Sequence, residues 1–143
     1  MEILESEIKD VIFFRPKRYE DERGFFSEIY NKQVYKEIGI DCNFVQDAHS
    51  FSKNKGTVRA LHFQKPPFSQ IQLVKVLKGS IFDVVVDIRP GSSTFGAYSN
   101  YVLSEENGRH LFVPEGFAHG FMSLEENTEV YYKMSQFYSP EHD

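Results

Sequence analysis

The chain has 143 residues and a mass of 16.7 kDa, the size of one ordinary domain. Hydrophobic residues make up 41% of it, and fourteen Phe and eight Tyr provide enough apolar area for a sizeable core. The net charge of −5 argues against a nucleic-acid or anionic-membrane partner, because both require a basic face. The single cysteine, Cys42, excludes an internal disulfide framework and a multi-cysteine metal site.

The N-terminal segment MEILESEIKD has neither the basic stretch nor the apolar run of a secretion signal. The longest apolar runs, such as VVV at 84–86, are far too short to cross a bilayer. The sequence therefore predicts a cytoplasmic location.

Short segments with period-two alternation, rich in Phe, Val, Ile and Tyr, predict strands separated by Gly, Pro and Asn turns. In chain order we expect strands at 11–14, 25–30, 43–51, 57–64, 70–77, 80–88, 98–104, 110–113, 119–124 and 128–137. Only 31–39 has helical spacing, and 104–107 is expected to add one helical turn.

This succession predicts an all-β fold, either a sandwich, a jelly roll or a barrel, formed by a single domain over residues 1–143. Gly79 is expected to form the tight turn of a hairpin between 70–77 and 80–88. The run IFDVVVDI is expected in the middle of a sheet with both faces covered, because it is apolar apart from two Asp. Such a shell encloses a cavity in which polar side chains require an explanation.

Polar residues on three expected strands face that cavity. Alternation places His62 and Gln64 on one face of 57–64, Gln70 and Gln72 on one face of 70–77, and Tyr132 on one face of 128–137. His and Tyr suit proton transfer, because His titrates near neutral pH and Tyr stays protonated there. The residues alone leave open the alternative of a core His and Tyr that only satisfy hydrogen bonds.

Three further residues are candidate anion contacts. Alternation puts Arg59 on the face opposite His62, so either the strand bulges or Arg59 serves the outer surface or a subunit interface. His119, between two glycines, is suited to binding phosphate or metal. Arg23, beside a glycine, is suited to an anion, although an ordinary surface turn is the alternative.

The sequence predicts neither a metal centre nor a nucleophilic serine. The five His residues form no HxH or HxxxH pair, and the position where small β-barrels commonly have HxH reads His62-Phe63-Gln64. No Ser lies in a GxSxG elbow.

Several long motifs occur in a characteristic order. They are DERGFFSEIYN (21–31), FVQDAHSFS (44–52), VRALHFQKPP (58–67), GSIFDVVVDIRPGSSTFG (79–96), LSEENGRHLFVPEGFAHGFMSL (103–124) and YKMSQFYSP (132–140). With them the chain resembles the dTDP-4-dehydrorhamnose 3,5-epimerases, a cupin-like jelly-roll family, over nearly its whole length.

The resemblance implies a homodimer that acts on a dTDP-4-keto-6-deoxy sugar without a cofactor or metal. His62, in the LHFQ motif, would be the base that removes the proton next to the ketone. Tyr132, in the YK motif, would be the acid that returns a proton on the other face. The substrate-binding positions it implies are Arg59, His119 and Arg23 for the sugar and diphosphate, Glu28 and Gln46 for the nucleotide, Tyr138 stacked on thymine, and Phe25 as a wall.

The chain departs from the family pattern within these motifs. The family usually has Lys where this chain has Gln72, and that lysine is associated with stabilising the enolate; an amide can donate a hydrogen bond but carries no charge. Ala60 stands at a usual Gly and Ala48 at a usual Asn.

The family also usually continues beyond the position of Asp143, to an Asp that orients the base His. Asp83 or Asp87, on the neighbouring strand, is a candidate substitute. We therefore expect a C-terminally short, divergent member of the family.

Three hypotheses about function follow. The first is an epimerase that inverts C3, C5 or both, or a keto-sugar isomerase that uses the same enolate. The second is a jelly-roll module that binds a nucleotide sugar but has lost catalysis, which the departure at Gln72 favours. The third, a metal-dependent cupin, is opposed by the missing HxH pair.

Overall fold

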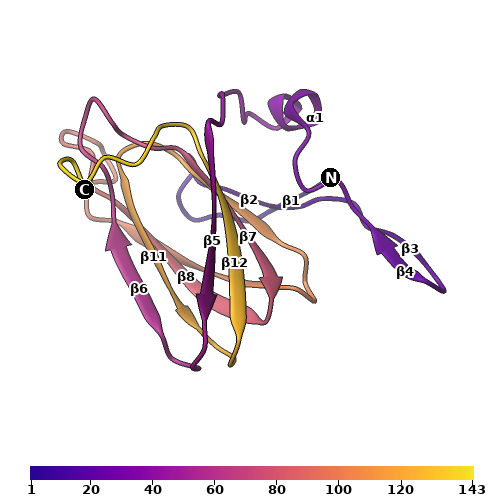
Figure 1. Cartoon of the computed structure of the whole chain (residues 1–143). Coiled ribbons are helices and arrows are strands. Elements are labelled where there is room, and N and C mark those ends of the chain that lie inside the picture. Colours follow the sequence, from indigo (N-terminus) through magenta and orange to yellow (C-terminus); the bar gives the residue numbers. More distant parts are fainter.

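The computed structural model describes all 143 residues as two β-sheets packed face to face, with one short helix and one projecting hairpin (Figure 1). The elements are β1 (Glu2–Leu4), β2 (Ile12–Arg15), β3 (Tyr19–Asp21), β4 (Gly24–Phe26), α1 (Lys32–Glu37), β5 (Gln46–Ser52), β6 (Val58–His62), β7 (Gln72–Lys78), β8 (Ser80–Asp87), β9 (Tyr98–Ser104), β10 (His110–Val113), β11 (Phe117–Ser123) and β12 (Thr128–Met134).

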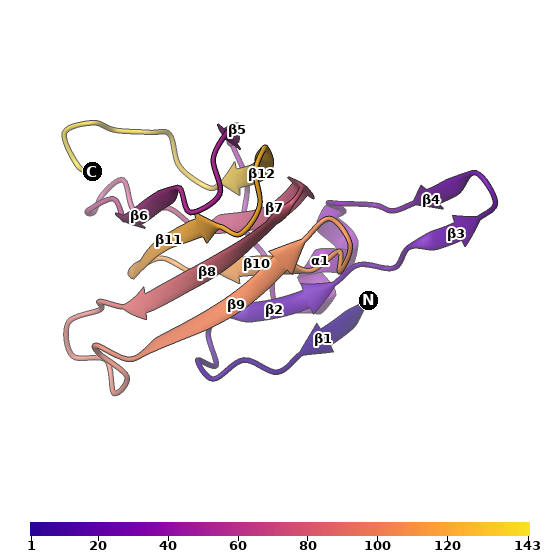
Figure 2. The same ribbon diagram turned by 90° about the horizontal axis from the view of Figure 1, so that it is seen from below.

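All strand pairs are antiparallel. The six-stranded sheet has the order β1-β2-β10-β7-β12-β5 and the four-stranded sheet the order β6-β11-β8-β9. The β3–β4 hairpin forms a separate two-stranded sheet that extends away from the sandwich (Figure 2). The prediction of an all-β, jelly-roll-like sandwich with one short helix is confirmed.

The main core lies between the two sheets and contains fourteen buried hydrophobic residues. Val74 and Val76 of β7 face Ile81 and Val85 of β8 within this cluster. Alternation produces this layer, because every second residue of β8 is buried and the others are half-buried. The strand lies inside its sheet, as predicted, but the expectation that both of its faces are fully covered is corrected.

A second, smaller core covers part of the outer face of the six-stranded sheet. Tyr35 of α1 is buried there against Phe14 of β2 and Leu73 of β7. The helix forms because Asn31 caps its first turn, accepting hydrogen bonds from two backbone amides with its side chain. Gly39, with φ of 95°, follows its last turn. The helix predicted at 31–39 is thus confirmed in a shorter form.

The turn at Gly79 connects the sheets rather than two paired strands. β7 belongs to the six-stranded sheet and β8 to the four-stranded sheet, so the prediction of a hairpin here is wrong. Gly79 has φ of 78°, and a Cβ atom there would lie 2.5 Å from the Oγ1 atom of Thr128. Only glycine therefore allows the chain to cross between layers in one residue.

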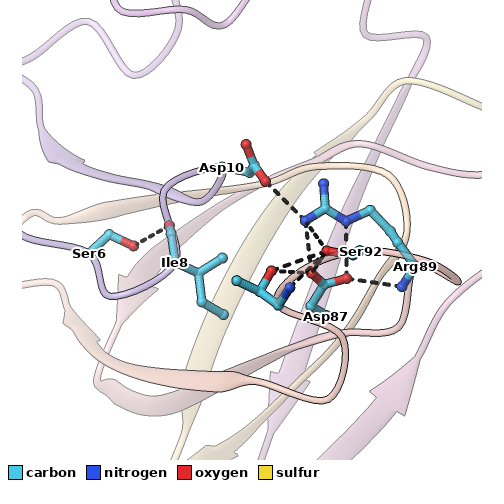
Figure 3. A network of polar contacts seen from close by, with 7 residues as sticks. Ser6, Ile8, Asp10, Asp87, Arg89 and Ser92 are labelled. Atoms are coloured by element: carbon cyan, nitrogen blue, oxygen red, sulfur yellow. Dashed lines mark hydrogen bonds and ion pairs between the residues drawn. The ribbon is translucent and has the colours of Figure 1, made fainter.

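The end of β8 is fixed by the network in Figure 3, which is centred on the buried carboxylate of Asp87. Nε and Nη2 of Arg89 donate to Asp87 at 3.0 and 2.8 Å, and the hydroxyls of Ser92 and Thr94 donate to it as well. Arg89 also pairs with Asp10 at 3.0 Å. These hydrogen bonds lower the pKa of Asp87 and attach the β8–β9 loop to the N-terminal segment.

Candidate active site

A cleft of about 650 Å³ opens at one end of the sandwich, between the edge strands β5 and β6. Its walls come from β5, β7 and β12 of one sheet and from β6 and β11 of the other, and the C-terminal segment lies at its rim. The lining residues are Ala48, Ser50, Val58, Arg59, Ala60, His62, Phe63, Gln64, Gln70, Gln72, His119, Gly120, Phe121, Tyr132, Met134, Tyr138 and Asp143. The cleft therefore joins apolar walls to a small set of polar groups, as a site for a small molecule does.

His62 and Tyr132 lie on opposite walls of this cleft. His62 is the last residue of β6 in the four-stranded sheet, and Tyr132 lies within β12 of the six-stranded sheet. Both side chains line the same cavity, on the faces that alternation predicted. A flat ring between the walls would have an imidazole on one side and a phenol on the other.

The phenol of Tyr132 is held in a defined position. Its oxygen lies 2.8 Å from the hydroxyl oxygen of Ser50 on the adjacent strand β5, and its ring packs 6.2 Å from that of Phe121. Burial raises the pKa of Tyr132 to about 12. The phenol therefore keeps its proton at neutral pH and can act as a proton donor.

A β-bulge places Arg59 in the cleft. In the pairing of β6 with β11, His62 faces His119 and Arg59 faces Phe121, so three steps on β6 match two steps on β11. The extra residue reverses the alternation and turns Arg59 to the same side as His62. Nε of Arg59 donates to the Ser52 hydroxyl at 3.1 Å, which links the edges of the two sheets.

His119 lines the cleft, but both of its ring nitrogens already have partners in the protein. Nδ1 lies 2.9 Å from Oε1 of Gln72, and Nε2 lies 2.8 Å from Oδ2 of Asp83. Asp83 is fully buried, and burial raises the pKa of its carboxyl group. The expectation that Asp83 or Asp87 orients His62 is corrected, because the first binds His119 and the second binds Arg89.

Gln64 is buried at the rim and holds the segment that follows β12. Its Nε2 donates to the carbonyl oxygens of Phe68 at 2.7 Å and Phe137 at 3.2 Å. Its Oε1 accepts a hydrogen bond from the backbone amide of Ser139 at 2.8 Å. The bonds to Phe137 and Ser139 fix the chain on either side of Tyr138, whose half-exposed ring lies at the cleft.

Gln46 lies beside this segment, because its Oε1 accepts a hydrogen bond from the backbone amide of Tyr138 at 3.0 Å. The structure thus brings together six of the predicted site residues. These are His62, Tyr132, Arg59, His119, Tyr138 and Gln46.

Arg23, Phe25 and Glu28 do not line the cleft of their own chain. Arg23 forms an exposed ion pair with Asp21 in the turn of the β3–β4 hairpin. Phe25 lies in β4 under the guanidinium of Arg18, and Glu28 accepts a weak hydrogen bond from the side chain of Asn31. Because the hairpin extends away from the sandwich (Figures 1 and 2), these predictions are not met within a single copy.

Ser50 was not identified as part of the site from the sequence, and Asp83 was considered only as a partner of His62 and not of His119. Alternation along β5 from Gln46 through Ala48 would have placed Ser50 on the cleft face. Asp83 lies on the buried face of β8 together with Val85. A carboxyl group among apolar core residues requires a partner, so its position in the alternation could have marked it as a functional residue.

No group of three or more His, Cys, Asp and Glu side chains in this chain is arranged to hold a metal ion. The single helix, α1, has six residues and cannot cross a membrane.

Comparison with known proteins identifies close relatives. The family model described as dTDP-4-dehydrorhamnose 3,5-epimerase matches residues 5–143. The protein of that name from Shigella flexneri is 49% identical over 140 residues, which is 97% of this chain and 77% of the relative. The one from Salmonella typhimurium is 50% identical over 141 residues, 98% of this chain and 76% of the relative.

Solved structures agree with these matches. The crystal structure of dTDP-4-dehydrorhamnose 3,5-epimerase from Bacillus anthracis, with TDP and PPi bound, aligns with a TM-score of 0.97 and 46% identity, over 99% of this chain and 81% of that chain. The epimerase from Legionella pneumophila, in complex with dTDP-4-keto-L-rhamnose, aligns with a TM-score of 0.94 and 45% identity, over 99% and 74%. The chain spans between 74% and 81% of the length of these four relatives.

Proposed function

Because the chain belongs to the dTDP-4-dehydrorhamnose 3,5-epimerase family, we propose that it inverts C3, C5 or both in a dTDP-4-keto-6-deoxyhexose. The observation that carries this proposal is the placement of His62 and Tyr132 on opposite walls of one cleft. Inversion at carbon requires a proton to leave from one face and another to arrive at the opposite face. Two groups that share a face could only restore the starting configuration.

In the first step, Nε2 or Nδ1 of His62 takes the proton from the carbon next to the ketone. The electron pair of the broken C–H bond moves into a new C=C bond, and the carbonyl electron pair moves to the oxygen, which gives an enolate. Such a C–H group is a weak acid, so this step needs both a positioned base and a hydrogen-bond donor at the oxygen.

In the second step, Tyr132 donates its phenolic proton to the same carbon from the other face. The new C–H bond forms as the enolate returns to the ketone. Tyr132 is left as a phenolate and His62 as an imidazolium, and proton exchange with water resets both groups. The raised pKa of Tyr132 supports its assignment as the acid of the second step, because the phenol is still fully protonated when the enolate forms.

Binding of the nucleotide part is assigned to the mouth of the cleft. Arg59 supplies a cation that two hydrogen bonds to β5 hold in place, which suits a diphosphate. Tyr138 offers an exposed ring for stacking on thymine, with Gln46 beside it. Binding energy gained there positions the sugar ring between His62 and Tyr132.

We also infer that the protein is a homodimer. Arg23, Phe25 and Glu28 lie on or next to a hairpin that has no role in its own cleft, and Phe25 and Phe26 there are 56% and 66% exposed. A hairpin of this kind can reach the cleft of a second copy. We further propose a cytoplasmic location, with which the unpaired thiol of Cys42 is compatible.

The proposed reaction is tested by incubating the purified protein with a dTDP-4-keto-6-deoxyhexose in D₂O. Proton NMR then follows loss of the C3 and C5 signals and formation of the epimers. An epimerase incorporates deuterium at one or both carbons and produces inverted sugar. Binding of the nucleotide sugar without any incorporation would instead identify a binding module, and a shifted carbonyl would identify an isomerase.

A further inference from the structure

A backbone group determines which end of the Gln70 amide faces the cleft. Gln70 lies two residues before β7 and lines the cleft, and its Nε2 donates a hydrogen bond to the backbone carbonyl oxygen of Gln136 at 2.8 Å. A carbonyl oxygen can only accept a hydrogen bond, so the nitrogen end of the amide must point at Gln136. The oxygen end, Oε1, has no hydrogen-bond partner in the protein and is not among the buried atoms that lack one. Gln70 therefore presents a free acceptor to the cleft.

The backbone around Gln70 holds this acceptor in place. The amide of Ile71 donates to the hydroxyl of Ser135 at 2.8 Å, and the amide of Ser135 donates to the carbonyl oxygen of Ile71 at 3.0 Å. The next residue, Gln72, pairs with Met134 at the end of the β7–β12 ladder. The side chain of Gln70 thus continues a ladder that is already formed. An acceptor fixed in this way loses little conformational freedom when a ligand binds.

Gln70 lies at the end of the cleft where the sugar is proposed to bind. A small cavity of about 10 Å³ adjoins the cleft, and both Gln70 and His62 line the cleft and this cavity. Tyr138 and Gln46, to which the proposed function assigns the nucleotide, do not line the small cavity. Because His62 is the proposed base for the sugar ring, the acceptor of Gln70 lies beside that ring.

The proposed substrate has a donor that matches this acceptor. In a dTDP-4-keto-6-deoxyhexose, C1 carries the diphosphate, C4 the ketone and C5 the methyl group, which leaves hydroxyl groups at C2 and C3. The ketone and the ionised diphosphate have only acceptor oxygens, whereas a hydroxyl group can donate. Inversion at C3 would change the direction of the C3 hydroxyl group during the reaction. The C2 hydroxyl group keeps its direction throughout, so it suits an acceptor that is fixed in place.

We propose that Oε1 of Gln70 accepts a hydrogen bond from the C2 hydroxyl group of the sugar, and that Gln70 thereby selects 2-hydroxy sugars over 2-deoxy sugars. This inference rests on the proposed function, because the sugar belongs to the proposed substrate. An analogue that lacks the hydroxyl group leaves the acceptor without a partner, which is why such sites reject it. The hydroxyl group takes no part in the proton transfers, so the contact strengthens binding rather than raising kcat.

Calorimetry with the parent protein tests the contact without turnover and without a variant. The ligands are dTDP-6-deoxyglucose, its 2-deoxy analogue and its 3-deoxy analogue, none of which has the ketone that the reaction requires. We expect the 2-deoxy analogue to bind about tenfold more weakly than dTDP-6-deoxyglucose, and the 3-deoxy analogue to bind within about twofold of it. Equal affinities for all three ligands, or a loss confined to the 3-deoxy analogue, would overturn the proposal.

Gln70→Met removes the acceptor and keeps a side chain of similar length. We expect dTDP-6-deoxyglucose to bind about tenfold more weakly to this variant, while the Kd values of dTDP and of the 2-deoxy analogue change less than about twofold. Gln33→Met makes the same substitution on the exposed face of α1 and should change none of the three. Thermal melts check that both variants are folded.

Two results with Gln70→Met would overturn the proposal. Equal losses of affinity for dTDP and dTDP-6-deoxyglucose would place the contact on the nucleotide. Equal losses for dTDP-6-deoxyglucose and its 2-deoxy analogue would show that Gln70 does not bind the C2 hydroxyl group. If Gln70→Met does not fold, the three affinities of the parent protein still decide.

Turnover gives a separate measurement with the corresponding 4-keto substrates. We expect the ratio of kcat/KM for the 2-hydroxy and 2-deoxy substrates to be about tenfold lower in Gln70→Met than in the parent, with kcat for the 2-hydroxy substrate unchanged within about twofold. An unchanged ratio would contradict the selection by Gln70. Absence of deuterium exchange in the parent would refute the proposed function alone, because the calorimetric comparison decides the role of Gln70 without it.

Discussion

The hydroxyl oxygens of Ser50 and Tyr132 lie 2.8 Å apart on neighbouring strands, so a single hydrogen bond holds the phenol of the proposed acid at the wall of the cleft. The bond does not change which group is protonated, because burial keeps the pKa of Tyr132 near 12. Its contribution is to aim the phenol at the carbon that receives the proton.

Ser50→Ala should therefore slow inversion more than it weakens binding. Loss of one neutral hydrogen bond corresponds to about 1 kcal/mol, or roughly fivefold in kcat, with KM nearly unchanged. Steady-state kinetics measures both parameters. An unchanged kcat would show that Phe121 and the surrounding wall orient Tyr132 without Ser50.

Gln64 is expected to determine nucleotide affinity although it need not touch the nucleotide. Gln64→Leu removes the hydrogen bonds to Phe68, Phe137 and Ser139 and releases the segment that carries Tyr138. We predict a loss of several-fold in dTDP affinity by calorimetry and faster proteolysis after Met134, because each lost bond leaves a backbone group unsatisfied. Equal affinity of parent and variant would contradict the role given to this segment.

Asp87 should stabilise the fold above acidic pH. Its hydrogen bonds, of which the one with Arg89 has the largest effect, hold the folded-state pKa of Asp87 below the ordinary value of 3.8. The stabilisation is therefore complete above pH 3.8 and is lost as pH falls through the folded-state pKa. Asp87→Asn should lower the free energy of unfolding at pH 7 by about 2 kcal/mol. Urea titrations should show this difference shrinking below pH 3.8, and a difference independent of pH would be the contrary result.

His110 should make the protein sensitive to mild acid. It is buried beside Phe14, and burial lowers its pKa from 6.5 to about 3. The unfolded chain therefore binds a proton below pH 6.5 that the folded chain does not, and stability falls between pH 6.5 and about 3. From pH 7.5 to 5 this single group accounts for about 2 kcal/mol.

His110→Phe should remove that part of the pH dependence, because phenylalanine cannot take up a proton in either state. Unfolding free energies of the parent and of the variant, measured at pH 7.5 and pH 5, give the difference directly. The prediction fails if both proteins lose the same stability between the two pH values.

Periodicity predicted most of the sandwich. β8 alternates buried with half-buried residues and β9 alternates buried with exposed ones, so the sequence located both strands closely. β1 and β3 were missed, since each has only three residues and includes an acidic side chain. Segments this short do not show a detectable period. The single-domain organisation of residues 1–143 stays a prediction.

Residues whose position depends on non-local pairing were harder to place. Arg59 lies in the cleft only because β6 has one extra residue opposite β11, and nothing within the strand itself specifies this bulge. Asp83 binds His119 because β8 pairs with β11. The two strands are far apart in the sequence, so alternation within either strand does not predict this contact. By contrast, the faces of His62 and Tyr132 followed from simple alternation within one strand each.

Position-resolved deuterium exchange in His62→Ala and Tyr132→Phe tests the opposite-face mechanism most directly. Each variant is incubated with the dTDP-4-keto-6-deoxyhexose in D₂O, and NMR follows exchange and inversion at C3 and C5 separately. We predict that His62→Ala shows neither exchange nor inversion while it still binds dTDP, and that Tyr132→Phe loses far more inversion than exchange. Exchange by His62→Ala at the rate of the parent protein would contradict the assignment of the base.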